Sequence, residues 1–198
     1  MEISMSGRTA IVTGGSKGIG YAIATRFVAS GADVLICARG KDALDEAVKS
    51  IGEAAKADKT KGSNRVGRIA ACAGDVAKPE DVKRIYDEAM KAFGKVDILV
   101  NNAGVSRAGA FETLTDERMQ EDLDQKLFAA IRMTRLVWPQ MKERRWGRVI
   151  NVLNIGAKSP RGNSAPTSVT RAAGMALTKV LANEGAPHNV LVNALLVG

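Results

Sequence analysis

Short apolar runs alternate along the chain with longer stretches in which apolar residues recur at helical spacing. The apolar runs predict six strands, which cover residues 9–12, 33–37, 68–72, 97–100, 148–153 and 189–194. The longer stretches predict helices over residues 18–30, 41–57, 115–141 and 167–182, and a further helix that begins at Pro79. Strands that alternate with helices are typical of a parallel sheet with helices on both faces. We therefore expect a doubly wound α/β fold.

The pattern predicts a single domain over residues 1–198, because no internal repeat and no linker rich in Pro, Gly or Ser divides it. The last predicted strand lies close to Gly198, and no helix or strand follows to cover it. An open sheet that stops at such a strand leaves a face or an edge exposed. We therefore expect that a C-terminal part of the domain is missing from these 198 residues.

The composition is ordinary for a soluble globular protein, with 45% hydrophobic and 25% charged residues. No apolar run is long enough to cross a bilayer, and residues 1–7 are too short and too polar for a secretory signal. These features predict a cytoplasmic protein that does not bind membranes. Cys37 and Cys72 lie at the ends of apolar runs, so we expect buried free thiols. With His188 as the single histidine, we expect no metal site.

The net charge of +8 raises the question of a polyanionic partner. Lysines and arginines are spread through most segments, and aromatic residues make up only 4% of the chain. Nucleic-acid-binding surfaces instead cluster their basic residues on one face. The charge therefore favours solvated surfaces and an anionic cofactor over nucleic acid.

A glycine-rich stretch follows the first predicted strand and opens the first predicted helix. Gly14, Gly18 and Gly20 allow a tight turn, bring backbone N–H groups close to a pyrophosphate, and let the helix pack against the sheet. The stretch predicts a dinucleotide site in a Rossmann-like fold, although any tight connection between a strand and a helix can use glycines in this way.

Four short motifs stand at the ends of predicted strands. They are Thr13-Gly14-x-x-x-Gly18-Ile19-Gly20, Gly74-Asp75-Val76, Asn101-Asn102-Ala103-Gly104 and Val192-Asn193-Ala194. Together they resemble the short-chain dehydrogenase/reductase family across the whole chain. The resemblance implies a cofactor site made of Gly14, Ser16, Lys17, Gly18, Ile19, Gly20, Arg39, Asp75, Val76, Asn102, Ala103, Gly104 and Arg171. It also implies that Asp75 meets the adenine ring.

The end of the second predicted strand indicates which dinucleotide is bound. Sites for NAD usually place a carboxylate there to hold the ribose 2′-hydroxyl, whereas a 2′-phosphate needs cations instead. Ala38 occupies this position, Arg39 follows it, and Lys17 in the glycine loop supplies a second cation. We therefore predict NADP(H) rather than NAD(H).

The resemblance fails at the catalytic residues, where the family uses Ser, Tyr, Lys and Asn. Asn154 stands at the serine position, Thr167 at the tyrosine position, Arg171 at the lysine position and Lys126 at the asparagine position. An aliphatic hydroxyl cannot replace a tyrosine whose pKa a neighbouring ammonium lowers into a useful range.

Two interpretations of these substitutions stay open. In one, the site is rewired: the Asn154 amide donates to a carbonyl oxygen, and Lys126 acts as the acid because Arg171 depresses its pKa. In the other, the site lacks the usual chemistry. The first interpretation predicts an NADP(H)-dependent oxidoreductase that acts between a carbonyl and an alcohol on an unknown small molecule. The second predicts a dinucleotide-binding sensor or a non-catalytic partner subunit.

The helices over residues 115–141 and 167–182 resemble the surface through which members of the family form dimers. Ala172, Ala173 and Gly174 are small enough to allow two such helices to approach closely. We expect a homodimer or a homotetramer.

Overall fold

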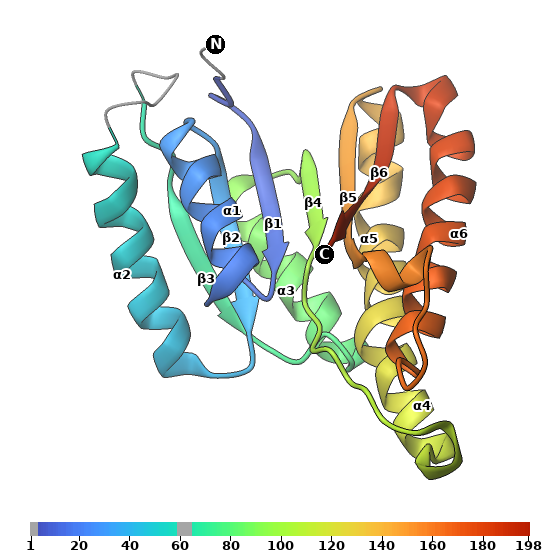
Figure 1. The fold of residues 1–198 in the computed structure, drawn as a ribbon. Coiled ribbons are helices and arrows are strands. Elements are labelled where there is room, and N and C mark those ends of the chain that lie inside the picture. Colours follow the sequence, from blue (N-terminus) through green and yellow to red (C-terminus); the bar gives the residue numbers. More distant parts are fainter. Residues whose placement is uncertain (1–3, 59–64) are drawn as a thin grey trace.

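The computed structural model describes residues 4–58 and 65–198. Six parallel strands form one sheet in the order β3-β2-β1-β4-β5-β6 (Figure 1). The strands are β1 (Thr9–Thr13), β2 (Asp33–Ala38), β3 (Ile69–Ala73), β4 (Ile98–Asn101), β5 (Gly147–Asn154) and β6 (Val190–Val197). The helices are α1 (Gly18–Ala29), α2 (Lys41–Ala57), α3 (Pro79–Phe93), α4 (Asp116–Leu123), α5 (Ala129–Glu143) and α6 (Thr167–Gly185).

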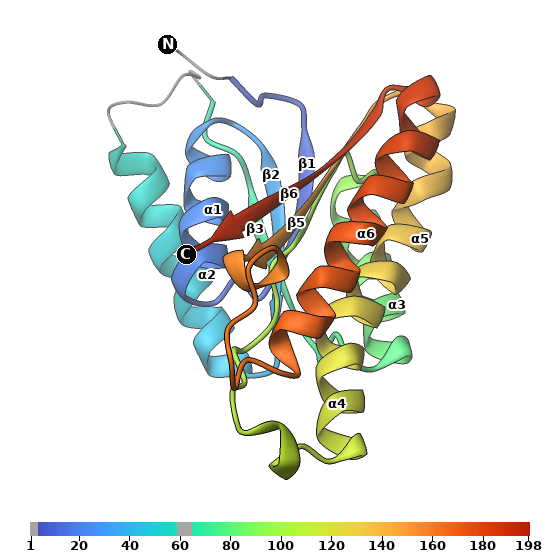
Figure 2. The ribbon, with the colours of Figure 1, turned by 45° about the vertical axis from the view of Figure 1, so that its right-hand side comes forward.

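The predicted doubly wound α/β fold is confirmed. Figure 2 shows the sheet between two layers, with α1 and α2 on one face and α3, α5 and α6 on the other. Each layer closes its own apolar core, one around Val12, Val28 and Ile36 and the other around Leu35 and Met133. Because both faces of the sheet are covered, strands β1 and β2 are apolar and buried along almost their whole length.

From β1 the chain adds strands toward one edge of the sheet (β2, β3), and from β4 it adds them toward the other edge (β5, β6). The direction in which the sheet grows therefore reverses between β1 and β4. The register Ala10↔Ile98 sets these two central strands side by side, and the chain leaves them toward opposite sides of the sheet. In doubly wound sheets, ligands bind in the crevice outside the carboxyl ends of the strands at this point. The glycine stretch between β1 and α1 lies at the carboxyl end of β1, on this side of the sheet (Figure 1).

The long helix predicted over residues 115–141 is confirmed, because helical backbone runs without a break from Asp116 to Glu143. The apolar pattern did not reveal the turn of π-helix over Asp124–Phe128, which separates α4 from α5. A π-turn places one extra residue within an otherwise regular helix. Within this turn, Lys126 is buried while Gln125 lines the cavity described below. Such turns occur often at functional sites.

Strand β6 leaves apolar surface uncovered, as the sequence predicts. Leu191 and Leu195 are 42% and 49% exposed. Strand β6 pairs with β5 alone, and no described helix covers the face of the sheet that these two side chains share (Figure 2). Among the residues that the structure describes, no helix is both long and apolar enough to span a membrane.

Candidate active site

A cavity of about 660 Å³ opens at the carboxyl ends of the central strands. With the exception of Gly20, every predicted cofactor residue lines it: Gly14, Ser16, Lys17, Gly18, Ile19, Arg39, Asp75, Val76, Asn102, Ala103, Gly104 and Arg171. The predicted catalytic positions Asn154 and Thr167 line the same cavity. The structure therefore brings the two groups of predicted site residues together in one space.

The glycine loop explains why Gly20 does not line the cavity. Gly14 has a φ of 66°, a conformation that side chains rarely adopt. Gly20 lies against it, and a Cβ at Gly20 would come within 2.3 Å of the Gly14 carbonyl oxygen. Gly20 thus lets α1 approach the loop closely, which keeps the first N–H groups of the helix at the crevice.

Thr13 holds this loop against the next segment of the site. Its Oγ1 accepts hydrogen bonds from the backbone N–H groups of Asn102 (2.9 Å) and Ala103 (3.0 Å), and it donates to the Val100 carbonyl oxygen (3.3 Å). The Asn102 side chain in turn donates to the carbonyl oxygens of Thr13 (2.9 Å) and Gly14 (3.2 Å). Thr13 belongs to the glycine motif but was not predicted as a site residue, although its place at the end of a buried strand beside a glycine turn was an available signal.

Two cations line the cavity beside the end of β2. Lys17 and Arg39 both face it, and neither forms an ion pair with any residue in the described part of the chain. No carboxylate follows β2, since Ala38 and Arg39 occupy that place. This end of the cavity is therefore suited to an anionic group.

A buried polar cluster lies at the predicted catalytic positions Lys126 and Thr167. Lys126 forms an ion pair with Asp122, and the two side chains are 1% and 0% exposed. The Lys126 ammonium also donates to Oγ1 of Thr167 at 2.8 Å, and Thr170 donates to the second Asp122 oxygen at 2.6 Å. Lys126 does not line the main cavity, whereas Thr167, to which it donates, does.

The Thr167 hydroxyl has one hydrogen-bonding capacity left. Its oxygen accepts from Lys126 and from the backbone N–H of Arg107 (2.9 Å). These donors occupy both lone pairs. Its hydrogen has no acceptor among the described residues, and Thr167 lines the cavity. The hydroxyl is thus left to donate to a ligand.

Burial sets the charge properties of this end of the cavity. It lowers the pKa of Lys126, and the charges of Arg171 and Arg107 lower it further, while Asp122 opposes the shift. The direction of the shift agrees with the sequence hypothesis, but burial is a larger cause than Arg171. Burial also lowers the pKa of Arg171, whose Nη1 donates to the Val152 carbonyl oxygen at 2.9 Å.

Three buried polar atoms of the described residues have no hydrogen-bond partner within the protein. They are Oε1 of Gln125, Oδ1 of Asn154 and Nε of Arg171, and all three residues line the cavity. Buried polar atoms without partners are costly, and their gathering at one cavity indicates that a polar ligand completes them. A nicotinamide dinucleotide, which carries phosphates, ribose hydroxyls and amides, fits these groups and the two free cations.

Of the other candidate groups, the two tyrosines lie away from the cavity, and Cys37 lines it with a buried thiol. The hydroxyl of Tyr21 bonds to Ser50 (2.6 Å) and that of Tyr86 to Gln140 (2.9 Å), so neither phenol reaches the site. Cys37 and Cys72 are free and buried, as predicted, and burial raises the pKa of the Cys37 thiol to about 12. No cluster of three or more potential metal ligands occurs within residues 4–58 and 65–198.

Comparison with known proteins agrees with this geometry. The family model of the short chain dehydrogenases matches residues 8–198. The human protein "Dehydrogenase/reductase SDR family member 4" is 36% identical over 196 residues, which is 98% of this chain and 66% of that protein. Its Caenorhabditis elegans counterpart is 36% identical over 97% of this chain and 70% of its own length. The chain thus spans about two thirds of the length of these relatives.

Solved structures give the same result. L-sorbose reductase from Gluconobacter frateurii, complexed with NADPH and L-sorbose, superposes with a TM-score of 0.90 at 35% identity, over 99% of this chain and 71% of that one. NAD+-bound xylitol dehydrogenase superposes with a TM-score of 0.86 at 26% identity, over 96% and 70% of the two chains. The chain therefore belongs to the short-chain dehydrogenase family, whose members bind a nicotinamide dinucleotide.

Proposed function

We propose that this chain is an NADP(H)-dependent oxidoreductase that interconverts a carbonyl and an alcohol on a small molecule. The observation that carries the proposal is one continuous cavity, with free cations at one end and a polarised hydroxyl at the other.

Lys17 and Arg39 support the choice of NADP(H) over NAD(H). A guanidinium binds a phosphate through two parallel hydrogen bonds, and Arg39 has no carboxylate partner to compete for it. A carboxylate after β2, which would repel a 2′-phosphate, is absent. Of the two structural neighbours named above, one is complexed with NADPH and the other is bound to NAD+.

The remaining cofactor residues have separate tasks. The glycine loop presents the N-terminus of α1 to the pyrophosphate, and Arg171 offers its free Nε to the ribose beside the reacting ring. The bound dinucleotide supplies the hydride donor or acceptor. A Cβ at Gly104 would lie 3.0 Å from Nη2 of Arg171, so a larger residue there would shift this guanidinium.

Thr167 and Lys126 support the oxidoreductase assignment at the catalytic end. The Thr167 hydroxyl donates a hydrogen bond to the substrate oxygen on which negative charge develops, and the Lys126 ammonium behind it strengthens that bond. The proton comes from Nζ of Lys126 and reaches the substrate oxygen through Oγ1 of Thr167, 2.8 Å away, so the threonine relays the proton and Lys126 is the acid. The lowered pKa of Lys126 makes it a better donor than an ordinary lysine.

A second candidate is a dinucleotide-binding protein without catalysis. It is favoured by the ion pair with Asp122, which already compensates the Lys126 charge, and by the engagement of Tyr21 and Tyr86 elsewhere. Under this candidate, the polar cluster only holds α4 and α6 together.

Calorimetric titration with NADPH and NADH tests the cofactor assignment. We expect NADPH to bind more tightly, and Arg39→Asp to weaken NADPH by about tenfold to a hundredfold because it replaces a charged hydrogen bond by repulsion. Arg135→Asp is the matched control, since Arg135 is exposed on α5 and does not line the cavity. Unchanged NADPH affinity in Arg39→Asp would contradict the assignment.

Turnover of a broad carbonyl panel with NADPH tests the oxidoreductase assignment. Thr167→Val keeps the shape of the side chain but removes the donor, so we expect the rate to fall by about a hundredfold to a thousandfold. The calorimetric affinity for NADPH should change little in the same variant. A protein that binds NADPH but reduces no carbonyl of the panel would favour the second candidate.

A further inference from the structure

Asp122 and Lys126 form an ion pair of a common type in an uncommon place. The two residues are four positions apart, as are Lys41 and Asp45 on α2, and that second pair is more than half exposed. Asp122 and Lys126 are instead buried completely. An exposed pair of this spacing is an ordinary feature of a helix surface, whereas the buried pair requires an explanation.

Burial of this pair is costly. Each charge loses its hydration, and a buried ion pair often stabilises a fold no better than apolar residues of similar volume. A role in which the pair only holds α4 against α6 therefore does not require charges at this place. The pair lies where the end of α4 meets the start of α6, and Nζ of Lys126 reaches Oγ1 of Thr167 there (Figure 2).

Both carboxylate oxygens of Asp122 are engaged. Oδ1 accepts from Nζ of Lys126, and Oδ2 accepts from Oγ1 of Thr170 at 2.6 Å. Thr170 follows Thr167 by three positions on α6, so the helix that presents the site hydroxyl also fixes the carboxylate. Lys126 is thereby held between Asp122 and Thr167 and donates one hydrogen bond to each.

Asp122 supplies a negative charge that faces Lys126, and two cations oppose it. These are Arg171, on α6, and Arg107, in the segment after β4, whose own partner Glu121 is mostly exposed. The two guanidinium groups and burial itself all favour the neutral amine of Lys126, and the carboxylate favours the ammonium. Without Asp122, the lysine would lie behind the site hydroxyl with a weakened hold on its proton.

We propose that Asp122 is a positioning residue: its carboxylate keeps the Lys126 ammonium charged and directs Nζ at Oγ1 of Thr167. This inference rests on the proposed function, in which Lys126 is the acid and Thr167 relays its proton. Asp122 is fully buried and lies outside the cavity lining, so it acts on the reaction through the lysine. The acid is thus protonated at neutral pH, when reduction requires it.

Two measurements on the full chain test this role. In the first, NMR of isotope-labelled lysine side chains follows the protonation of Lys126 against pH, and Lys126→Met assigns its signal. Asp122→Asn removes the charge and keeps the shape of the side chain. Asp124→Asn is the matched control, because the Asp124 carboxylate pairs with Arg132 and both side chains are partly exposed.

In the wild type, we expect Lys126 to keep its proton through neutral pH. In Asp122→Asn it should lose the proton about 1–3 pH units lower, because the charge that opposes burial and the two arginines is gone. Asp124→Asn should leave the titration of Lys126 unchanged. The wild type alone covers the case in which Asp122→Asn does not fold: a lysine already neutral at neutral pH overturns the proposal.

The second measurement is the pH dependence of kcat for the reduction of a carbonyl by NADPH. Reduction consumes the proton of Lys126, so the rate falls as the pH rises through the pKa of this lysine. In Asp122→Asn this fall should begin about 1–3 pH units lower. The rate at neutral pH should then drop by about tenfold or more and recover at lower pH. A purely structural role would lower the rate by the same factor at every pH.

The outcomes separate this role from the function on which it rests. An unchanged Lys126 titration in Asp122→Asn, or a changed titration that the rate does not follow, overturns the role of Asp122 while turnover still supports the function. Equal effects in Asp122→Asn and Asp124→Asn overturn it too. A wild type that reduces no carbonyl overturns the proposed function and, with it, the role of Asp122, whatever the NMR titration shows.

Discussion

Thr13, below the glycine loop, and Thr167, beside Lys126, have oxygens that each accept hydrogen bonds from two N–H groups. The two threonines differ in the hydrogen bond that the hydroxyl hydrogen makes. That of Thr13 goes to the Val100 carbonyl oxygen, whereas that of Thr167 has no acceptor in the described structure. Thr13 therefore serves the scaffold, and Thr167 keeps one bond for a ligand.

The same contrast separates the two halves of the cleft. In the cofactor half, the polar groups of the glycine loop are hydrogen-bonded within the protein. The groups left free for a ligand are the charged ends of the exposed side chains Lys17 and Arg39. In the catalytic half, a charged pair is fully buried and its only route to the cavity is a hydroxyl.

The largest effect is expected when the buried pair is broken. Asp122→Asn leaves the Lys126 ammonium buried without a counter-charge, so we expect the free energy of unfolding to fall by about 3–5 kcal/mol. Chemical denaturation measures this change. Asp124→Asn, two positions along the chain, is the control. Its partner Arg132 is partly exposed, so the fall in the free energy of unfolding should stay below about 1 kcal/mol. Equal losses in the two variants would contradict the burial argument.

The sign of the pH dependence in Asp122→Asn follows from the same pair. Without Asp122, the pKa of Lys126 drops further below the value of about 10.4 that an unfolded lysine has. Between these two values the unfolded chain binds more protons than the folded one, so stability rises with pH in that window. A stability that falls with rising pH there would show that the ammonium is not the destabilised group.

A smaller effect is expected from crowding the cofactor half. Gly20→Ala puts a Cβ within 2.3 Å of the Gly14 carbonyl oxygen, so α1 must shift, at a cost of about 1–3 kcal/mol and with weaker NADPH binding. Gly52→Ala in α2 is the matched control, since nothing lies within 4 Å of its added Cβ. We expect that control to gain up to about 1 kcal/mol in thermal unfolding experiments. An equal response in both variants would contradict the packing role of Gly20.

The sequence predicted the fold and most of the cofactor half, because local patterns encode both. Apolar runs gave each strand to within a few residues, and the glycine spacing identified the loop at Gly14 and Gly18. Every predicted cofactor residue except Gly20 lines the cavity, and Gly20 packs directly beside it.

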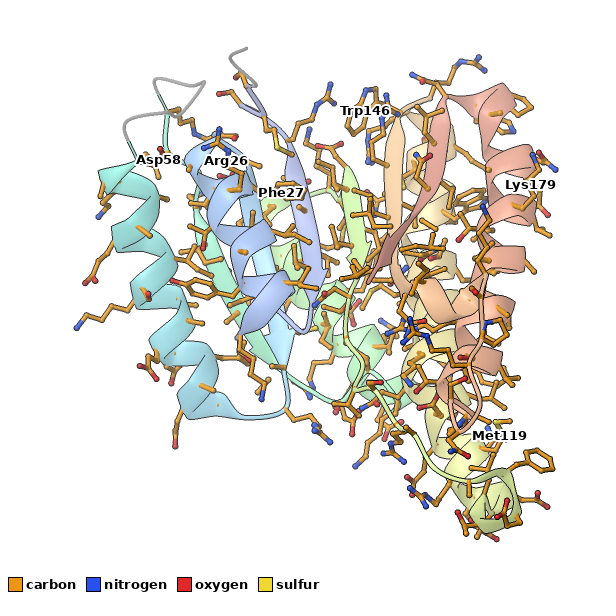
Figure 3. The ribbon with its side chains drawn as sticks, in the orientation of Figure 1. Arg26, Phe27, Asp58, Met119, Trp146 and Lys179 are labelled. Carbon is orange, nitrogen blue, oxygen red and sulfur yellow. The ribbon has the colours of Figure 1, made fainter. Side chains whose placement is uncertain are left out.

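The catalytic half was less predictable, because its properties depend on contacts between distant segments. Asp122, which pairs with Lys126, was not singled out, and the hydrogen bond from Lys126 to Thr167 joins residues 41 positions apart. Nothing in the helical pattern marked the π-turn that carries Gln125. Contacts between distant segments also occur away from the site: at the opposite end of the sheet, the guanidinium groups of Arg8 and Arg148 both lie over the ring of Trp146 (Figure 3).

The two halves of the cleft are independent if the cofactor half still binds NADPH when the buried pair Asp122 and Lys126 is removed. Asp122→Leu combined with Lys126→Met removes both charges and leaves the cavity lining unchanged. Calorimetric titration of this variant with NADPH should give a dissociation constant within about threefold of that of the wild type. If a folded double variant bound NADPH more than about tenfold more weakly, the two halves would not be separable and the account would be wrong.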